Sequence, residues 1–289
     1  MQIQGGGCKE QQSAEYSLTA VGEMLSAIAP NSTHSAKEQI VAINIENKTV
    51  LITGANRGIG KEIVKGAIAR GAGKVYAAVR KLESAEPLVA EFGERVVPVR
   101  LDLEDPQSIE AAAQQAGDVQ VVINNAGVAN TTSALAANAV ESLEYEVNIN
   151  ASGLLRVARA FAPVLKSNGG GALVQINSVV SIKTFAQVAT YSASKAASYA
   201  LTQALREELA GQGTLVVSVH PGPIATDMAR QAGLEEGAEP PSVVADAIFE
   251  ALASGTYHVF PDSMAQQFWG GYQSYARAMI ESPLVKEKA

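Results

Sequence analysis

The 289-residue sequence predicts an α/β fold, a single doubly wound domain around a parallel sheet of seven strands. From Lys48 onward, short runs of Val, Ile and Leu alternate with longer stretches of helical periodicity. The apolar runs are continuous, which is typical of strands buried on both faces. The helical stretches supply the crossovers that parallel strands require. The predicted strands are Thr49–Thr53, Val75–Val79, Val96–Leu101, Val119–Ile123, Ala172–Ile176, Thr214–Val219 and Tyr257–Phe260.

The chain is expected to divide near residue 45. Residues 1–45 are rich in Gly, Ser, Gln and Ala, and predict an N-terminal extension that is flexible or forms a short docking helix. Residues 46–289 are expected to form the main domain, which ends in a helical tail over 263–289. Two long helices are predicted inside this domain, over Val140–Leu165 and Tyr191–Ala210.

Composition excludes several classes of protein. The net charge is −7 and the sequence has no block of basic residues, which argues against a nucleic acid or a membrane surface as partner. A single cysteine and three scattered histidines argue against a disulfide framework and against a metal site. No apolar run is long enough to cross a bilayer, and no secretory signal is recognisable. We therefore expect a cytoplasmic protein.

A glycine-rich turn follows the first predicted strand. It reads Thr53-Gly-Ala-Asn-Arg-Gly-Ile-Gly60 and leads into a helical stretch. Gly54, Gly58 and Gly60 allow a tight turn and a close approach of the backbone to a pyrophosphate, which the helix N-terminus would attract. Taken alone, the turn is also compatible with a plain structural loop. Its position after the first strand of an α/β pattern favours a dinucleotide-binding Rossmann domain.

The second strand indicates which dinucleotide is bound. It ends Ala77-Ala-Val-Arg80, without the acidic residue that would take a ribose 2′-hydroxyl. Arg57 lies within the glycine turn itself. Guanidinium groups grip phosphates through paired hydrogen bonds, so Arg57 and Arg80 predict NADPH/NADP⁺ as the cofactor. The alternative is that both arginines are solvated surface charges.

Five motifs together resemble the classical short-chain dehydrogenases/reductases. They are the glycine turn, Asn124-Asn-Ala-Gly127, Ser178, Tyr191-x3-Lys195 and Pro221-Gly222, in the order and spacing of that family over about residues 46–265. The resemblance implies a Rossmann-type oxidoreductase that moves a hydride between the nicotinamide and a carbonyl or secondary alcohol. With the two arginines, it suggests a carbonyl reductase that prefers NADPH.

The resemblance implies that Tyr191 is the general acid/base. A free phenol has a pKa near 10, and a nearby cation lowers that value. Lys195 lies four residues on, hence on the same helix face, and we expect it to lower the pKa of Tyr191 and to bind the nicotinamide ribose. Ser178 resembles the family serine that hydrogen-bonds the substrate oxygen; Ser181 is a nearby competitor.

A fourth catalytic residue is an asparagine near the start of the long helix. The family pattern places it nine residues before a basic residue followed by alanine, and Arg159-Ala160 therefore selects Asn150 over Asn148. In the family this asparagine bends the helix and holds a water that relays protons to the lysine.

His220, which precedes the Pro221-Gly222 turn, is interpreted as structural and not as a base.

The remaining expected cofactor contacts flank the ends of the strands. Besides the residues named above, the resemblance assigns the cofactor Asn56, Ile59, Asp102, Leu103, Asn125, Ala126, Gly127, Pro221, Gly222, Ile224 and Thr226.

The substrate is less well defined by the sequence. A short lid is expected between Thr226 and Pro241, and Phe185, Val188 and Met228 are candidates for an apolar wall. We expect a small carbonyl or alcohol substrate. A 3-oxoacyl thioester reductase and a non-catalytic NADP(H)-binding regulator remain as alternatives, whereas enoyl reduction is disfavoured by the spacing of Tyr191 and Lys195.

The family usually forms homodimers or homotetramers through its two long helices. The expected contact residues are Leu154, Val157, Ala193, Ala196, Ala197 and Ala200.

Overall fold

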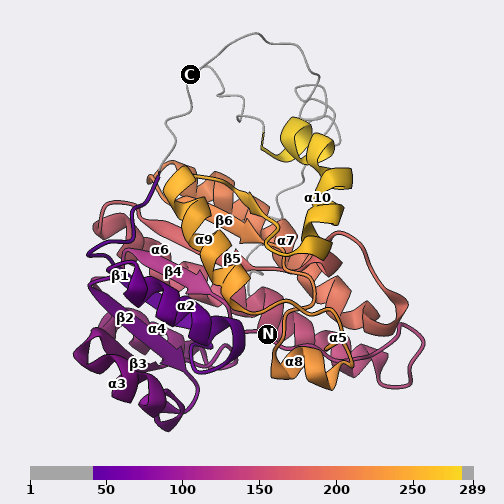
Figure 1. The fold of residues 1–289 in the computed structure, drawn as a ribbon, viewed down its shortest axis with the longest axis horizontal. Coiled ribbons are helices and arrows are strands. Elements are labelled where there is room, and N and C mark those ends of the chain that lie inside the picture. The colour runs from indigo at the N-terminus through magenta and orange to yellow at the C-terminus, as the bar shows by residue number, and fades with distance from the viewer. Residues whose placement is uncertain (1–41, 282–289) are drawn as a thin grey trace, which may run out of the picture. The chain divides into compact units, whose positions relative to one another are not determined.

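The computed structural model describes residues 42–281, and within them it shows the predicted doubly wound α/β fold (Figure 1). Every strand pairs in parallel with its neighbours in a seven-stranded sheet of order β3-β2-β1-β4-β5-β6-β7. The strands are β1 (Thr49–Thr53), β2 (Lys74–Val79), β3 (Val96–Arg100), β4 (Val121–Asn124), β5 (Ala172–Ile176), β6 (Leu215–Val219) and β7 (His258–Val259). All seven overlap the predicted runs, so both fold class and strand number are confirmed.

Helices cover both faces of the sheet (Figure 1). The described helices are α2 (Gly58–Ala69), α3 (Glu86–Phe92), α4 (Pro106–Gln115), α5 (Ala139–Val147), α6 (Gly153–Ser167), α7 (Ala189–Ala210), α8 (Asp227–Gln231), α9 (Ser242–Ser254) and α10 (Ser263–Tyr275). Successive side chains of a strand point to opposite faces, and here both directions are apolar. In β1, Ile52 packs in a core with α2, α3 and α9, whereas Leu51 packs in a second core with α4, α6 and α7.

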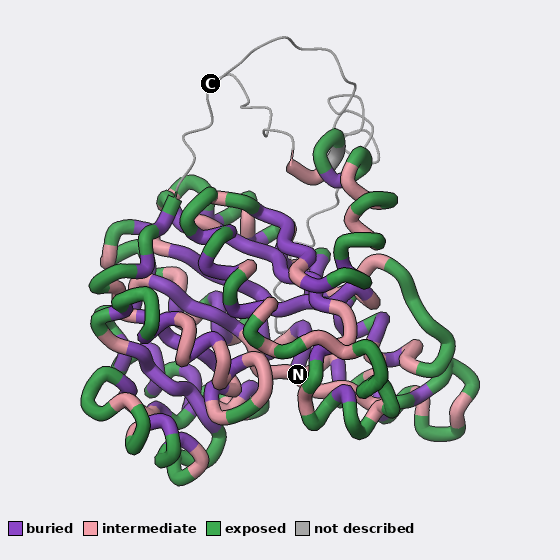
Figure 2. The backbone as a smooth tube through the Cα atoms, viewed as in Figure 1, coloured by how far each residue is buried: buried purple, intermediate pink, exposed green. Residues whose placement is uncertain are grey.

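The burial pattern explains why the strands read as continuous apolar runs. Figure 2 shows the strands as a buried centre surrounded by half-buried and exposed helices. The central strands β4 and β5 are buried at every position. Strands β1 and β4 lie side by side in the sheet, and the strand order runs outward in opposite directions on either side of them. In sheets of this kind the ligand crevice lies beyond the carboxyl ends of the strands at that point.

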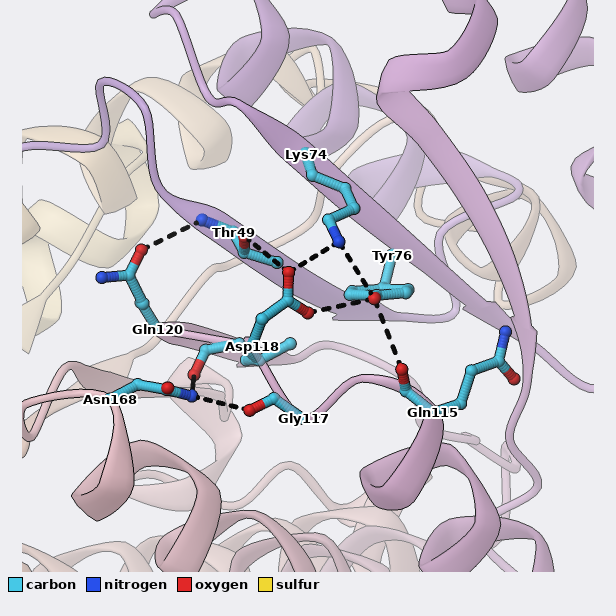
Figure 3. Close-up of polar contacts among 9 residues, drawn as sticks. Thr49, Lys74, Tyr76, Gln115, Gly117, Asp118, Gln120 and Asn168 are labelled. Carbon is cyan, nitrogen blue, oxygen red and sulfur yellow. Dashed lines mark hydrogen bonds and ion pairs between the residues drawn. The ribbon is translucent and has the colours of Figure 1, made fainter.

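A polar network lies at the amino ends of the strands, opposite the carboxyl ends (Figure 3). Asp118 accepts a 2.6 Å contact from the Lys74 ammonium and a 3.0 Å hydrogen bond from the Tyr76 hydroxyl, and so ties β2 to the turn before β4. Hydrogen bonding to Asp118 and Tyr76 raises the pKa of Lys74. These groups mark the amino ends of the strands, and we assign them a structural role.

The domain begins slightly earlier than predicted. Ile43 and Ile45 are buried in the core that contains α9, and the Ile43 amide donates a 2.7 Å hydrogen bond to the Leu252 carbonyl. Residues 42–45 therefore belong to the domain and not to the extension. The other residues of the predicted extension, including the proposed docking helix, lie outside the described residues, as do 282–289 of the tail.

One helical prediction needs correction, and another is confirmed over the described residues. The stretch predicted as one helix over Val140–Leu165 is α5 and α6, joined by a π-helical turn over Asn148–Ser152. The apolar periodicity of the sequence does not reveal this turn. The predicted tail is helical as α10 and a second π-helical turn, Ala276–Ile280. No helix between residues 42 and 281 combines the length and the apolar character needed to cross a bilayer.

Candidate active site

The glycine turn of residues 53–60 forms the cradle that the sequence predicts. Gly54 and Gly58 have φ values of +64° and +51°, a region that favours glycine. A Cβ atom on Gly60 would lie 2.1 Å from the Gly54 carbonyl oxygen, so no larger residue fits there. The turn leads into α2, whose N-terminal amides are suited to a pyrophosphate. These features fit a bound dinucleotide.

The Asn-Asn-Ala-Gly motif braces this cradle. The Asn125 side-chain amide donates hydrogen bonds to the carbonyl oxygens of Thr53 (2.9 Å) and Gly54 (3.3 Å). The Thr53 hydroxyl in turn accepts from the backbone amides of Asn125 and Ala126. The Asn125 amide therefore holds the ends of β1 and β4 together, and its expected contact with the cofactor stays a prediction.

The two arginines differ in their surroundings. Arg80 is exposed at the end of β2 and makes no hydrogen bond or ion pair with any residue from 42 to 281. The Arg57 guanidinium lies 3.5 Å from the Asp227 carboxylate, an exposed and therefore weak pair that a bound phosphate can replace. Asp102 is half-buried and its carboxylate accepts from the Glu104 amide. The Leu103 carbonyl is already occupied by Arg156.

Tyr191 and Lys195 lie in the first two turns of α7. The Lys195 ammonium is buried, donates a 2.8 Å hydrogen bond to the Ile176 carbonyl at the end of β5, and lies 5.9 Å from the centre of the Tyr191 ring. Burial lowers the pKa of Lys195 to about 8. Small and hydroxylated neighbours on α7, such as Ser194, allow this close packing.

We expected Lys195 to lower the pKa of Tyr191, but the surrounding protein groups raise it. Burial raises the pKa of Tyr191 to about 12, although part of the side chain remains exposed; hydrogen bonding with Ser178 opposes the rise and the Glu146 charge adds to it. The sequence argument counted the cation and omitted desolvation, which favours the neutral phenol.

Asn150 is at the centre of the π-helical turn. Its carbonyl oxygen accepts from the Val128 amide at 3.0 Å, and its amide donates to the Val128 carbonyl (2.8 Å) and the Ser194 hydroxyl (2.9 Å). A Cβ atom on Gly127 would lie 2.9 Å from the Asn150 oxygen and 3.5 Å from the Lys195 nitrogen. Asn150 and Lys195 therefore meet around Gly127. Asn148 instead accepts from Arg156.

Ser178 follows β5 and faces Tyr191, whereas Ser181 turns away. The Ser178 hydroxyl is buried and donates to the Pro221 carbonyl at 3.3 Å. Ser181 contacts the Ser178 carbonyl and His220 Nδ1, at 3.0 Å for the latter. Burial lowers the pKa of His220 to about 3, so this ring stays neutral, which supports the structural interpretation.

The Pro221-Gly222 turn continues into the loop that covers the glycine cradle. Thr226 caps α8, and its methyl group would be 3.1 Å from a Cβ atom on Gly58. Ile224 is buried, and Ala225 donates to the Glu239 carbonyl. The Gly222 amide donates to the Asp262 carboxylate at 2.7 Å, which ties this turn to the start of α10. The predicted lid between Thr226 and Pro241 contains the short helix α8.

Two groups near the site escaped the sequence analysis. Glu146 on α5 is fully buried; one carboxylate oxygen accepts from the Asn130 amide at 2.6 Å and the other has no hydrogen-bond partner. Burial raises the pKa of this carboxyl. The second is α10, which packs on the loop that follows Ser178. Neither has a sequence motif, and only the fold brings them to the site.

Among residues 42–281, no group of three or more His, Cys, Asp or Glu is placed to hold a metal ion. The candidate chemical groups are Tyr191, Ser178, Lys195 and Asn150, which lie beside the glycine cradle at the carboxyl ends of β1, β4, β5 and β6.

Comparison with curated proteins finds relatives of similar and of greater length. "Oxidoreductase BOA17" of Botryotinia fuckeliana is 32% identical over 231 residues, which are 75% of this chain and 82% of that protein. "Glycine betaine reductase ATRR" of Emericella nidulans is 34% identical over 191 residues, 64% of this chain but 15% of the relative. The chain thus spans only a small part of that longer protein.

Solved structures show the same fold. A short chain dehydrogenase from Burkholderia cenocepacia, crystallised in complex with NADP, shares 36% identity and a TM-score of 0.75, covering 83% of this chain and 100% of the other. The family model described as short chain dehydrogenase matches residues 48–237, which contain the glycine cradle and all four candidate catalytic residues. The chain belongs to the short-chain dehydrogenase family of oxidoreductases.

Proposed function

We propose that the protein is an NADPH-dependent reductase of aldehydes or ketones. The observation that carries this proposal is the meeting of Ser178 and Tyr191 at the end of β5, beside buried Lys195 and the glycine cradle. A bound nicotinamide dinucleotide would supply the hydride. The chain's own residues would orient the carbonyl and provide the proton.

Carbonyl reduction requires a protonated donor beside the carbonyl oxygen. Since the pKa of Tyr191 is raised to about 12, its phenol carries a proton at neutral pH and can donate it to the carbonyl oxygen as negative charge develops. Ser178 would donate a hydrogen bond to the same oxygen. Lys195 would bind the ribose, and Asn150 would hold the neighbouring loop and helix in place for proton resupply. The regulator alternative leaves these four groups without a purpose.

The preference for NADPH rests on Arg80 and Arg57. The end of β2 has no carboxylate to bind a ribose 2′-hydroxyl, and the Arg80 guanidinium has no ion-pair partner among the described residues. The relative of known structure from Burkholderia cenocepacia was solved with NADP, which supports the same choice.

The cofactor assignment is tested by titrating NADPH and NADH into the wild-type protein and Arg80→Ala. Loss of a charge-assisted hydrogen bond costs about 1.5–3 kcal/mol, so the variant should bind NADPH roughly 10- to 100-fold more weakly and NADH equally well. Arg95→Ala is the matched control, because Arg95 directly precedes β3 and so lies at the amino ends of the strands, away from the carboxyl end of β2 that Arg80 follows. Equal NADPH and NADH affinities in the wild type would contradict the assignment.

The reaction class is tested with a panel of carbonyl substrates followed by NADPH absorbance. The panel should include a 3-oxoacyl thioester, since that alternative stays open. The nearest lid arginine, Arg230, is paired with both Asp227 and Glu235, and so offers little to an anionic carrier. We therefore expect free ketones or aldehydes to be preferred. NADPH binding without turnover of any carbonyl would favour a regulator.

We also propose that the protein forms a homodimer or homotetramer, but with contact residues that differ in part from those expected. Leu154 and Val157 are fully buried in the core of one chain and cannot contact a second copy. Ala193, Ala196 and Ala200 are exposed on α7, and Tyr145 and Leu155 are exposed apolar groups on α5 and α6. Small residues permit close helix pairing. Light scattering of the purified protein tests this, and a monomer would contradict it.

A further inference from the structure

The C-terminal helix α10 packs directly on the loop that carries Ser178. Val179, Phe260 and Ala265 form a small core that is separate from the two cores on the faces of the sheet, and this core includes Ile182, Phe268 and Trp269. The Phe185 and Phe268 rings meet edge to face, with centroids 6.3 Å apart. Helix α10 therefore borders the segment between Ser178 and Tyr191.

The first turn of α10 is fixed beside the Pro221-Gly222 turn. The buried Asp262 carboxylate caps α10 by accepting from the Ala265 amide, and also accepts from the Gly222 amide. A Cβ atom on Gly222 would lie 3.3 Å from Met264 Cβ. Pro221 itself contacts the Ser178 hydroxyl, so Met264 lies close to the groups that would hold the carbonyl.

Apolar side chains at this position are left exposed. Met264 and Phe185 are each 41% exposed. Met264 and Phe268 are four residues apart, and so share one face of α10. Exposed apolar groups that cluster around a reactive site are typical of a ligand-binding surface.

We propose that Met264 and Phe268 of α10, together with Phe185, form an apolar wall of the substrate pocket that selects carbonyl compounds with an extended apolar chain. The proposal rests on the proposed carbonyl reduction and deepens it. One end of the substrate would be held at Ser178 and Tyr191, and the rest would lie along α10. The sequence analysis placed only Phe185 in such a wall and did not include α10.

The charged groups nearby do not form a site for an anion. The Lys183 ammonium lies 5.7 Å from the centre of the Phe185 ring and donates to the Thr184 carbonyl. Glu239, whose carboxylate accepts from the Ser263 amide, brings a negative charge to the first turn of α10. A carboxylate substrate attracted by Lys183 is the competing interpretation, and one substrate of the test represents it.

The test compares kcat/KM for 2-octanone, acetone and 4-oxopentanoate with saturating NADPH. Burial of one methylene group contributes about 0.8 kcal/mol, or roughly a fourfold gain. We expect 2-octanone, which has five more methylene groups than acetone, to be favoured by at least about 100-fold. Equal values for the two neutral ketones, or a preference for 4-oxopentanoate, would overturn the proposal.

Variants of α10 test whether Met264 and Phe268 cause the preference for 2-octanone over acetone. Phe268→Ala and Met264→Ser should each reduce the preference for 2-octanone over acetone by roughly tenfold, because each removes apolar contact area, while NADPH affinity is unchanged. Tyr275→Ala is the control on the same helix, since Tyr275 is 55% exposed at its far end. An unchanged preference in both α10 variants would overturn the proposal even if the wild type reduces ketones.

A binding measurement separates this proposal from the proposed reaction. Trp269, the single tryptophan, stacks on Phe260 with centroids 4.9 Å apart and follows Phe268 directly. With NADP⁺ bound, 2-octanone should change the Trp269 fluorescence at far lower concentration than acetone, and Phe268→Ala should weaken this binding. If that result appears without any turnover, the wall stands and the reaction is wrong. No difference between the ketones would overturn the wall.

Discussion

Burial favours the uncharged forms of both Tyr191 and Lys195. It raises the pKa of the phenol to about 12 and lowers the pKa of the ammonium to about 8. Motif spacing correctly brings the two residues together but carries no information about desolvation. The phenol therefore retains its proton in the protein's own environment, which suits a group that must donate it to a carbonyl oxygen.

Lys195→Met is expected to stabilise the protein at neutral pH while abolishing activity. Between pH 8 and 10.5, the unfolded chain binds a proton at Lys195 that the folded chain has lost, so the wild-type free energy of unfolding rises with pH there. Below pH 8 the folded protein bears the full cost of the buried charge. The variant should be more stable at pH 7 by at most about 3 kcal/mol.

Urea unfolding at several pH values measures this difference. It should shrink through the pH 8 to 10.5 window and vanish above it. Lys81→Met, at an exposed lysine, is the control and should show no such trend. A difference that is absent at pH 7, or constant with pH, would show that Lys195 is not strongly desolvated.

Glu146→Gln is expected to move the deprotonation of Tyr191 to lower pH. The Glu146 charge raises the pKa of Tyr191, and the amide removes that charge at nearly constant shape. The pH profile of alcohol oxidation, which needs the phenolate, should shift toward lower pH. Glu141→Gln on the exposed side of α5 serves as the control. An identical profile for Glu146→Gln and the wild type would remove Glu146 from the site.

At the scale of elements, the main departure from the sequence is the π-helical turn between α5 and α6. The apolar periodicity predicts one continuous helix over this stretch. Only the family resemblance, which implies a bend at Asn150, pointed to an irregularity here. The turn places the Asn150 amide against Val128 and Ser194. π-helical turns often occur at functional sites, and here the turn aims a side chain that a regular helix would place elsewhere.

Helix α10 is held by a buried chain of hydrogen bonds below the site. His258 in β7 contacts the Tyr199 hydroxyl of α7 at 2.6 Å and the Glu281 carboxylate at 2.5 Å. The hydrogen bond from His258 lowers the pKa of Glu281, so this contact contributes stability above pH about 4.5 and loses it as pH falls. These hydrogen bonds join α7 to Glu281, which follows the π-helical turn Ala276–Ile280.

Glu281→Ala should therefore loosen α10 without unfolding the domain. Amide hydrogen exchange in residues 263–280 should become faster by roughly tenfold, as expected for the loss of about 1.5 kcal/mol from a charged hydrogen bond, while α2 and the sheet keep their protection. Glu250→Ala, on the exposed face of α9, is the control. Unchanged exchange in α10 would mean that its apolar contacts alone hold it.

At the scale of the whole molecule, local sequence patterns were sufficient to predict the number of strands in the sheet and their approximate positions. Strands buried on both faces read as continuous apolar runs, and each of the seven strands overlaps such a run, as the predicted Val119–Ile123 overlaps β4. The motifs also predicted residues that the structure brings near one another, with Ser178 beside Tyr191 and Asn150 near Lys195 around Gly127, while their catalytic roles stay predictions. The contacts of α10 with the Ser178 loop could not be predicted, because they join residues about 80 positions apart and depend on apolar side chains without a motif.

The central claim, that Tyr191 delivers the proton in an NADPH-dependent carbonyl reduction, is tested most directly by Tyr191→Phe. The measurement is turnover of a ketone that the wild type reduces, at saturating NADPH, together with the affinity for NADPH. Loss of a general acid should lower kcat by about 10²- to 10⁴-fold and leave NADPH affinity within about twofold. Turnover of Tyr191→Phe close to that of the wild type would contradict the claim.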